Sequence, residues 1–317
     1  MRVLVIGGSG FIGPFVVAGL LNGGHEVTVF RRGSGGPVPL GAAEIRGNRR
    51  HLGDYAGVLR ALAPDVVLDM ILSSERQARE LMDLFAGVAG RVVALSSIDV
   101  YRACGVLHGT EPGPLEPVPL TEDSPVRSQP AYPPESLKML QGIYGWVDDD
   151  YDKVPVERVI LSRAALPGTV LRLPMVYGPG DPLHRVKRID DGRPAILLEE
   201  TIAAWRACRG YVENVAAAIA LAVTNGKARN RTYNVAEPDN FTELEWTRKI
   251  CEVAGWQGEV RVVPRAQCPP HLILPGDFRQ HWSADSTRIR NEFGYQEPFS
   301  VDEGIRRALG WERSSQA

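Results

Sequence analysis

Short apolar runs alternate with helix-like segments along the first half of the chain. The apolar runs lie at 2–6, 26–30, 65–70, 91–95 and 169–173, with a weaker one at 43–46. The helical patterns lie near 11–22, 54–62, 75–88 and 153–165. Because the apolar runs are continuous rather than alternating, they are typical of parallel strands that are covered on both faces. The alternation predicts an α/β protein with a doubly wound parallel sheet.

The second half of the chain mixes these patterns. Helices are predicted at 212–225 and 243–254, and the second one opens with a capping box formed by Thr242 and Glu245. A similar box, Ser300 with Glu303, opens a C-terminal helix, and residues 233–235 predict one more strand.

A proline-rich segment separates the two halves. Residues 112–134 contain eight prolines, so neither a helix nor a central strand can run through them. The segment follows the fifth strand, and it therefore lies at the carboxyl edge of the sheet, where ligands bind. It is predicted either as part of a substrate wall or lid, or as a disordered insert.

The first apolar run leads into a glycine-rich turn, Gly7-Gly8-Ser9-Gly10-Phe11-Ile12-Gly13. A strand, a glycine-rich turn and a helix in this order form a dinucleotide site, because the backbone can approach a pyrophosphate and the helix N-terminus faces its charge. The alternative is a tight turn without a ligand. At the end of the second strand, where NAD sites usually carry an acid, stand Arg31 and Arg32. Two guanidinium groups favour NADP, with NAD possible, unless they are only solvated surface charges.

Composition narrows the class of protein and its partners. The 317 residues are 44% hydrophobic and 23% charged, with a net charge of −2, so no nucleic acid is expected as a partner. No apolar stretch is long enough for a membrane span, and the N-terminal run is explained as a strand rather than a signal peptide. The four cysteines lack metal-ligand spacing. We therefore expect a cytoplasmic protein without a metal.

Five segments carry a resemblance to a known family. They are Gly7–Gly13, Ser96–Tyr101, Leu171–Gly180, Arg209–Val215 and Tyr233–Val235. In this order they resemble the fingerprint, the serine box and the downstream motifs of the extended and atypical extended short-chain dehydrogenase/reductases, the NAD(P)-dependent epimerase/dehydratase family. The sequence departs from the family at Met175, where asparagine is common.

The resemblance implies a Rossmann domain at 1–174 plus about 211–240, and a smaller substrate-binding domain at 175–210 and 241–317. It also implies reversible hydride transfer at a carbinol carbon of a sugar nucleotide or another polyhydroxylated small molecule. A homodimer through the helices near 75–88 and 153–165 is expected from the family.

The catalytic pair departs from the family pattern, which is Tyr-x-x-x-Lys. Here Tyr151 and Lys153 are only two residues apart. If Asp152 is an N-cap, Lys153 to Pro155 form the first helical turn and Tyr151 precedes it, so that the tyrosine can fold back beside the lysine. We predict Tyr151 as the acid/base, with Lys153 binding the ribose and lowering the tyrosine pKa. The alternative is a structural Tyr151 and a protein that has lost this chemistry.

Further residues take roles by analogy with the family. Ser97 corresponds to the catalytic serine, or else it caps the strand end. Asp99 is either a second acid/base or a turn residue. The predicted cofactor contacts are Gly7, Gly10, Phe11, Ile12, Gly13, Arg31, Arg32, Asn48, Met70, Ser96, Lys153 and Pro174. The predicted substrate contacts are Met175, His184, Arg209 and Tyr211. Of these, Arg209 is expected either to meet a substrate phosphate or to form an ion pair.

Three functions remain open from the sequence. The first is an epimerase/dehydratase-type oxidoreductase, and the second is a simple NADPH-dependent ketone reductase that releases its cofactor. The third is a non-catalytic dinucleotide-binding regulator or an RNA-binding protein. The displaced tyrosine favours the third, whereas Ser97, Lys153 and the near-neutral charge speak against an RNA role.

Overall fold

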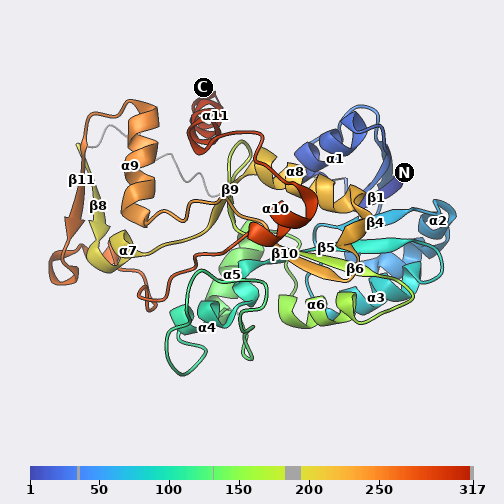
Figure 1. Cartoon of the computed structure of the whole chain (residues 1–317), viewed down its shortest axis with the longest axis horizontal. Helices are drawn as coiled ribbons and strands as arrows, with labels where there is room; N and C mark the ends of the chain where they lie inside the picture. The colour runs from blue at the N-terminus through green and yellow to red at the C-terminus, as the bar shows by residue number, and fades with distance from the viewer. Residues whose placement is uncertain (34–35, 131, 183–193, 315–317) are drawn as a thin grey trace.

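A large lobe built on one sheet and a smaller lobe at the far end make up the molecule (Figure 1). The computed structural model describes residues 1–33, 36–130, 132–182 and 194–314. No helix in these ranges is long and apolar enough to cross a membrane.

Seven parallel strands form the sheet of the large lobe. They run in the order β10-β6-β5-β4-β1-β2-β3, and every neighbouring pair is parallel. Their bounds are β1 (Arg2–Ile6), β2 (Glu26–Arg31), β3 (Ala43–Arg46), β4 (Val66–Asp69), β5 (Arg91–Ser97), β6 (Gly168–Leu173) and β10 (Arg231–Asn234). The doubly wound parallel sheet is therefore confirmed, with strand ends within two residues of those predicted.

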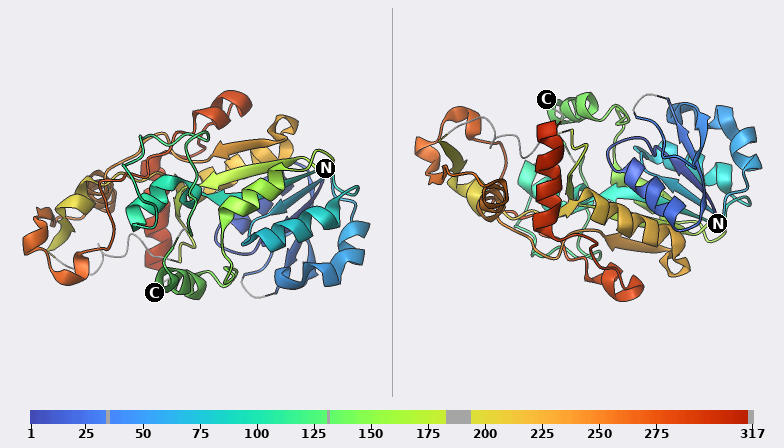
Figure 2. Two further views of the ribbon diagram at one scale, coloured as in Figure 1. Left: turned by 90° about the horizontal axis from the view of Figure 1, so that it is seen from below. Right: turned by 90° about the horizontal axis from the view of Figure 1, so that it is seen from above.

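Helices cover both faces of this sheet (Figure 2). On one face α1 (Gly13–Asn22) and α8 (Val212–Thr224) pack over a buried aliphatic cluster that includes Val5 and Leu171. On the other face lie α2 (Ala56–Ala61), α3 (Glu75–Phe85) and α6 (Lys153–Leu161), over a second cluster that includes Leu4 and Val170. Alternate residues of each strand thus enter opposite layers, which explains why the apolar runs are continuous.

One predicted helix begins later than expected. Helix α2 starts at Ala56 instead of residue 54, after a 3-10 segment (Arg49–Tyr55) that Asn48 caps by accepting a hydrogen bond from the Arg50 N–H at 3.1 Å. His51 has non-helical backbone angles (φ −127°, ψ 46°), and they interrupt the helical pattern of this segment.

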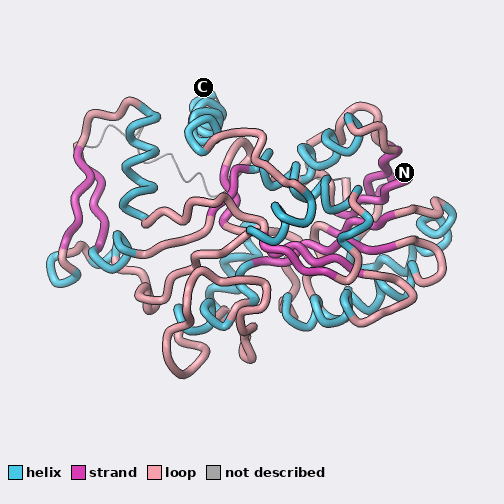
Figure 3. The backbone as a smooth tube through the Cα atoms, viewed as in Figure 1, coloured by secondary structure: helices cyan, strands magenta, loops and turns pink. Residues whose placement is uncertain are grey.

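The smaller lobe holds a two-stranded parallel sheet of β8 (Ala195–Glu199) and β11 (Glu259–Val263), with α7 (Glu200–Ala204) and α9 (Glu243–Ala254) beside it. Both halves of the predicted capping box at Thr242 and Glu245 are present at the start of α9. Strands β7 (Met175–Tyr177) and β9 (Arg209–Tyr211) pair between the two lobes (Figure 3).

The C-terminal part of the chain touches both lobes. Helix α10 (Thr287–Phe293) packs against β10, where the Tyr233 hydroxyl donates a hydrogen bond to Glu292 at 2.6 Å. Helix α11 (Val301–Ser314) packs against α9. Within the range 241–317, which is predicted to belong to the substrate domain, α10 thus lies against the large sheet.

Hydrogen bonds fix the proline-rich segment to the large lobe. It joins α4 (Arg102–His108) to α5 (Pro134–Ile143). The Leu120 N–H donates to the Ser283 carbonyl at 2.7 Å, and the Arg127 N–H donates to the Val100 carbonyl at 2.8 Å. The described part of the segment is therefore a tethered loop rather than a disordered insert.

Candidate active site

The glycine-rich turn has the shape that a pyrophosphate requires. Gly7 has φ +88°, and a Cβ there would lie 2.7 Å from the Ile71 side chain, while a Cβ on Gly13 would collide with the Gly8 backbone. At Gly10, in contrast, the described structure has no atom within 4 Å of the position of a Cβ. Helix α1 begins at the N-cap Ile12, whose aliphatic side chain has no oxygen to cap the helix. Open space at Gly10 and uncapped N–H groups fit a bound dinucleotide.

Phe11 and Ile12 lie at the end of this turn, directly before α1. Both side chains are partly buried and pack against the apolar cluster that contains Tyr177 and Tyr211. The Phe11 ring lies 3.3 Å from the position of a Cβ on Gly180. These contacts join the predicted cofactor turn to the elements between the lobes.

The two arginines at the end of β2 differ in their surroundings. Arg31 is buried, and its Nε donates to Glu44 Oε1 at 3.0 Å while its Nη1 donates to the Gly36 carbonyl at 2.7 Å. Arg32 is exposed, and its Nη2 lies 3.4 Å from the position of a Cβ on Gly145. The predicted two-arginine grip on a phosphate is corrected accordingly, because the Arg31 charge is neutralised by Glu44.

Ser96 and Pro174 face the protein interior. The Ser96 hydroxyl donates to Glu157 Oε1 at 2.5 Å, and the same carboxylate accepts from Arg172 Nη2 at 2.7 Å. The Ser96 side chain thus has a buried structural role, and the cofactor contact of this residue stays a prediction. Pro174 is buried beside Gly210. Met70 is buried at the end of β4, at the carboxyl edge of the sheet.

The start of α6 has the predicted geometry. Asp152 is the N-cap and accepts a hydrogen bond from the Val154 N–H at 2.9 Å, so that Lys153 opens the first turn and Tyr151 precedes the helix. Lys153 Nζ lies 5.8 Å from the centre of the Tyr151 ring. It donates to the Leu95 carbonyl at 3.0 Å and also to the Leu72 carbonyl. An ammonium group has three N–H donors, so these two hydrogen bonds leave one, and the centre of the Trp146 ring lies 5.1 Å from the nitrogen.

The Tyr151 hydroxyl points to Asp99. It donates a hydrogen bond to Asp99 Oδ2 at 2.9 Å. Burial raises the pKa of Tyr151 well above its usual value, and the Asp99 charge adds to this effect. The net direction is thus opposite to the lowering that was predicted from Lys153, because burial dominates. Burial also lowers the pKa of Lys153, to about 8.

A second tyrosine, Tyr132 of the proline-rich loop, shares the same carboxylate. Its hydroxyl donates to Asp99 Oδ2 at 3.1 Å. Asp99 is 2% exposed, and burial raises its pKa although Arg127 acts in the opposite direction. Among the described residues, Asp99 Oδ1 has no hydrogen-bond partner. Sequence reasoning missed Tyr132, because it stands in no motif and only the folded loop brings it to Asp99.

Ser97 is the last residue of β5 and precedes Asp99 by two positions. Its hydroxyl oxygen accepts the Asp99 N–H at 3.2 Å and so caps the short 3-10 turn Ile98–Val100. The side chain is partly exposed at the carboxyl end of β5. Ser97 thus has the capping role. Its partial exposure is also compatible with the predicted contact between its hydroxyl group and a reacting substrate oxygen.

The structure changes the set of predicted substrate contacts. Tyr211 is fully buried and its hydroxyl donates to Glu213 at 2.7 Å, so it is a core residue and not a substrate contact. Arg209 is 4% exposed and pairs with Glu243, so its predicted phosphate contact is corrected to the ion pair that was the alternative. Met175 stays partly exposed on β7. His184 lies outside the described residues.

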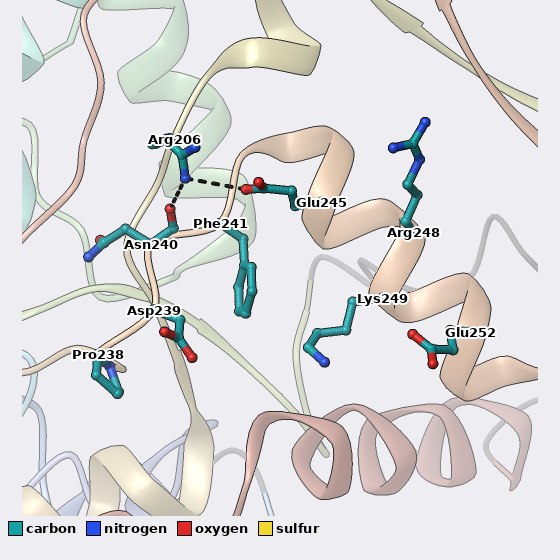
Figure 4. Close-up of a pocket in the computed structure, with 9 residues that line it drawn as sticks. All are labelled: Arg206, Pro238, Asp239, Asn240, Phe241, Glu245, Arg248, Lys249 and Glu252. Atoms are coloured by element: carbon teal, nitrogen blue, oxygen red, sulfur yellow. Dashed lines mark hydrogen bonds and ion pairs between the residues drawn. The ribbon is translucent and has the colours of Figure 1, made fainter.

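A pocket of about 550 Å³ lies in the smaller lobe beside α9 (Figure 4). Its lining residues are Arg206, Pro238, Asp239, Asn240, Phe241, Glu245, Arg248, Lys249 and Glu252. In the described ranges no group of three or more His, Cys, Asp or Glu side chains has the arrangement of a metal site.

Comparison with known proteins agrees with the fold and the glycine-rich turn. Residues 3–134 match the NAD dependent epimerase/dehydratase family. The chain is 30% identical over 249 residues to 2'-dehydrokanamycin reductase of Streptomyces kanamyceticus, which covers 74% of this chain and 62% of that protein. It is 24% identical to UDP-glucose 4-epimerase of Corynebacterium glutamicum, over 92% of this chain and 93% of the relative.

A solved structure gives the same architecture. The dTDP-glucose 4,6-dehydratase of Bacillus anthracis in complex with NAD superposes with a TM-score of 0.72 at 17% identity, covering 100% of this chain and 97% of that one. Residues 3–134 therefore form an NAD dependent epimerase/dehydratase domain, and the whole chain shares the fold of the dehydratase structure.

Proposed function

We propose that the protein is an NAD(P)-dependent oxidoreductase that transfers a hydride at a carbinol carbon of a polyhydroxylated small molecule. The observation that carries the proposal is the buried hydrogen bond from the Tyr151 hydroxyl to Asp99, with the Lys153 ammonium beside the tyrosine ring. An acid/base of this kind next to a dinucleotide turn suits the interconversion of an alcohol and a ketone. The relatives named above are a 2'-dehydrokanamycin reductase and a UDP-glucose 4-epimerase.

The chain's own groups move the proton in this proposal. When bound at the glycine-rich turn, the reduced cofactor NAD(P)H would supply the hydride for the carbonyl carbon. The Tyr151 hydroxyl gives its proton to the carbonyl oxygen, and its raised pKa keeps that proton in place until the oxygen becomes basic. Asp99 accepts the hydrogen bond of the Tyr151 hydroxyl at 2.9 Å and so positions it, and the tyrosine oxygen takes one proton from water to complete the cycle. Oxidation of the alcohol follows the same path in reverse.

The proposal is tested with a substrate panel. NADPH and NADH consumption is measured with keto sugars, keto aminoglycosides and nucleotide-linked keto sugars. Turnover of at least one class supports the proposal, and tight NADP binding without turnover of any class favours a non-catalytic regulator. Net consumption of NADPH identifies a reductase, whereas cofactor that stays bound through turnover identifies an epimerase. Retention of a stem-loop RNA would support the RNA-binding alternative.

We propose NADP as the preferred cofactor, on the basis of Arg32. This guanidinium is exposed at the end of β2, next to the buried Arg31–Glu44 pair. An Arg32→Ala variant is expected to weaken NADP binding about tenfold and to leave NAD binding unchanged, because it loses one charge-assisted hydrogen bond to the 2′-phosphate. Fluorescence titration with both cofactors measures this. Arg261→Ala, an exposed arginine on β11 of the smaller lobe, is the control. Equal losses for NAD and NADP would contradict the assignment.

We also propose a cytoplasmic homodimer that associates through α3 and α6. These helices lie side by side on one face of the sheet (Figure 2). Light scattering coupled to size-exclusion chromatography gives the oligomeric state, and a monomer would overturn the proposal.

A further inference from the structure

Arg209 is held in place from several sides. Its Nη1 donates to the Ala207 carbonyl at 3.1 Å and to the Phe241 carbonyl at 3.3 Å. Its Nη2 donates to Glu243 in the first turn of α9, and the guanidinium carbon lies 4.8 Å from the centre of the Trp246 ring. The positive charge is thus buried and already neutralised by a carboxylate.

This arrangement has a consequence for anions. A phosphate that bound Arg209 would have to displace Glu243, and the displaced carboxylate would lose a partner that balances its charge in a partly buried place. With Glu243 in place, a phosphate would meet a negative charge at this position. The ion pair therefore acts against any ligand that carries a phosphate group here.

The pocket beside α9 does not offer a second binding site for a phosphate. Arg206 donates to Glu245 at 3.2 Å and to the Asn240 carbonyl at 2.8 Å, and Lys249 pairs with Asp302 at 2.5 Å. The third cation that lines the pocket is Arg248, and its side chain extends away from the Phe241 ring in Figure 4. The carboxylates of Asp239 and Glu252 line the same space. In this pocket two of the three cations already pair with carboxylates, and two further carboxylates would repel a diphosphate.

We infer that Glu243 determines specificity: by occupying Arg209 it selects a polyhydroxylated carbonyl substrate without a phosphate or diphosphate group. This inference rests on the proposed function, because it names the substrate class of that reaction. A sugar or an amino sugar without a nucleotide fits the class. Glu243 acts through Arg209 and not on the reacting atoms.

The test measures binding without turnover. Calorimetric titration of the wild-type protein with UDP is expected to give a Kd weaker than about 1 mM. Glu243→Gln keeps a hydrogen-bond acceptor for Arg209 but removes the negative charge, so UDP is expected to bind at least about tenfold more tightly to this variant. The double variant Glu243→Gln/Arg209→Gln is expected to lose that gain. Glu259→Gln, at an exposed position on β11 and outside the pocket lining, is the control and is expected to bind UDP like the wild type.

Two results would overturn the inference. One is micromolar UDP binding by the wild type that Arg209→Gln weakens, a measurement that needs no Glu243 variant. The other is a folded Glu243→Gln protein, verified by its thermal transition, that binds UDP no better than the wild type. Failure of the substrate panel concerns the proposed reaction alone, because these titrations do not depend on activity. In the panel itself, the inference requires higher kcat/KM for keto sugars without phosphate than for nucleotide-linked ones.

Discussion

Tyr151→Phe is expected to lower kcat about 1,000-fold while leaving the affinity for the cofactor unchanged. The substitution removes only the hydroxyl that donates to Asp99 Oδ2 at 2.9 Å and keeps the ring beside Lys153. A positioned acid/base contributes about 10²- to 10⁴-fold to a rate, so its loss acts on the chemical step. Steady-state kinetics with the substrate that turns over fastest, together with a cofactor titration, measures both effects.

Tyr55→Phe is the matched control for this experiment. Tyr55 packs edge-on against Phe30 with ring centres 5.1 Å apart, far along the sheet from Asp99. Its hydroxyl has no role in the proposed reaction, so kcat is expected to stay within about twofold of the wild type. A Tyr151→Phe enzyme with full turnover would refute the role of Tyr151. In that case Tyr132, whose hydroxyl reaches the same Asp99 oxygen at 3.1 Å, would be the residue to test next.

Gly10→Ala is expected to weaken cofactor binding about 100-fold without lowering the melting temperature. The described protein has no atom within 4 Å of the added methyl group, so the folded chain tolerates it. The methyl group would fill the space through which a pyrophosphate approaches the backbone, and a 100-fold loss corresponds to about 2.7 kcal/mol. Fluorescence titration with NADPH and thermal unfolding measure the two quantities.

Gly57→Ala provides the comparison for that variant. Gly57 lies in α2, and the described structure likewise has no atom within 4 Å of a Cβ there. Because alanine is the better helix former, this variant is expected to bind NADPH normally and to be slightly more stable. If Gly10→Ala binds NADPH as tightly as Gly57→Ala does, the dinucleotide does not pass over Gly10.

The sheet could be predicted from the sequence because it depends on local patterns. Continuous apolar runs mark β1, β4 and β5. Both faces of each strand are buried, so each run can be recognised as a central parallel strand. The N-terminus of α6 was predicted for a similar reason, since the position of Pro155 restricts where a helix can begin.

The side-chain partners of the site could not be predicted in the same way. Arg31 is neutralised by Glu44, which belongs to the neighbouring strand, and Arg209 by Glu243, which is 34 residues away. Tyr132 reaches Asp99 because the proline-rich loop folds back over the end of β5. Such pairings depend on tertiary contacts, and burial then sets the pKa of Tyr151 against the effect of its neighbouring lysine.

Helix α10 limits how this protein can be recombined with its relatives. It follows the smaller lobe in sequence, yet it covers β10, the edge strand of the large sheet, through the bond from Tyr233 to Glu292. A chimera that exchanged everything after residue 240 would put a foreign helix on this edge. An exchange that ends before Thr287 would transplant the smaller lobe and leave the host's own edge strand covered.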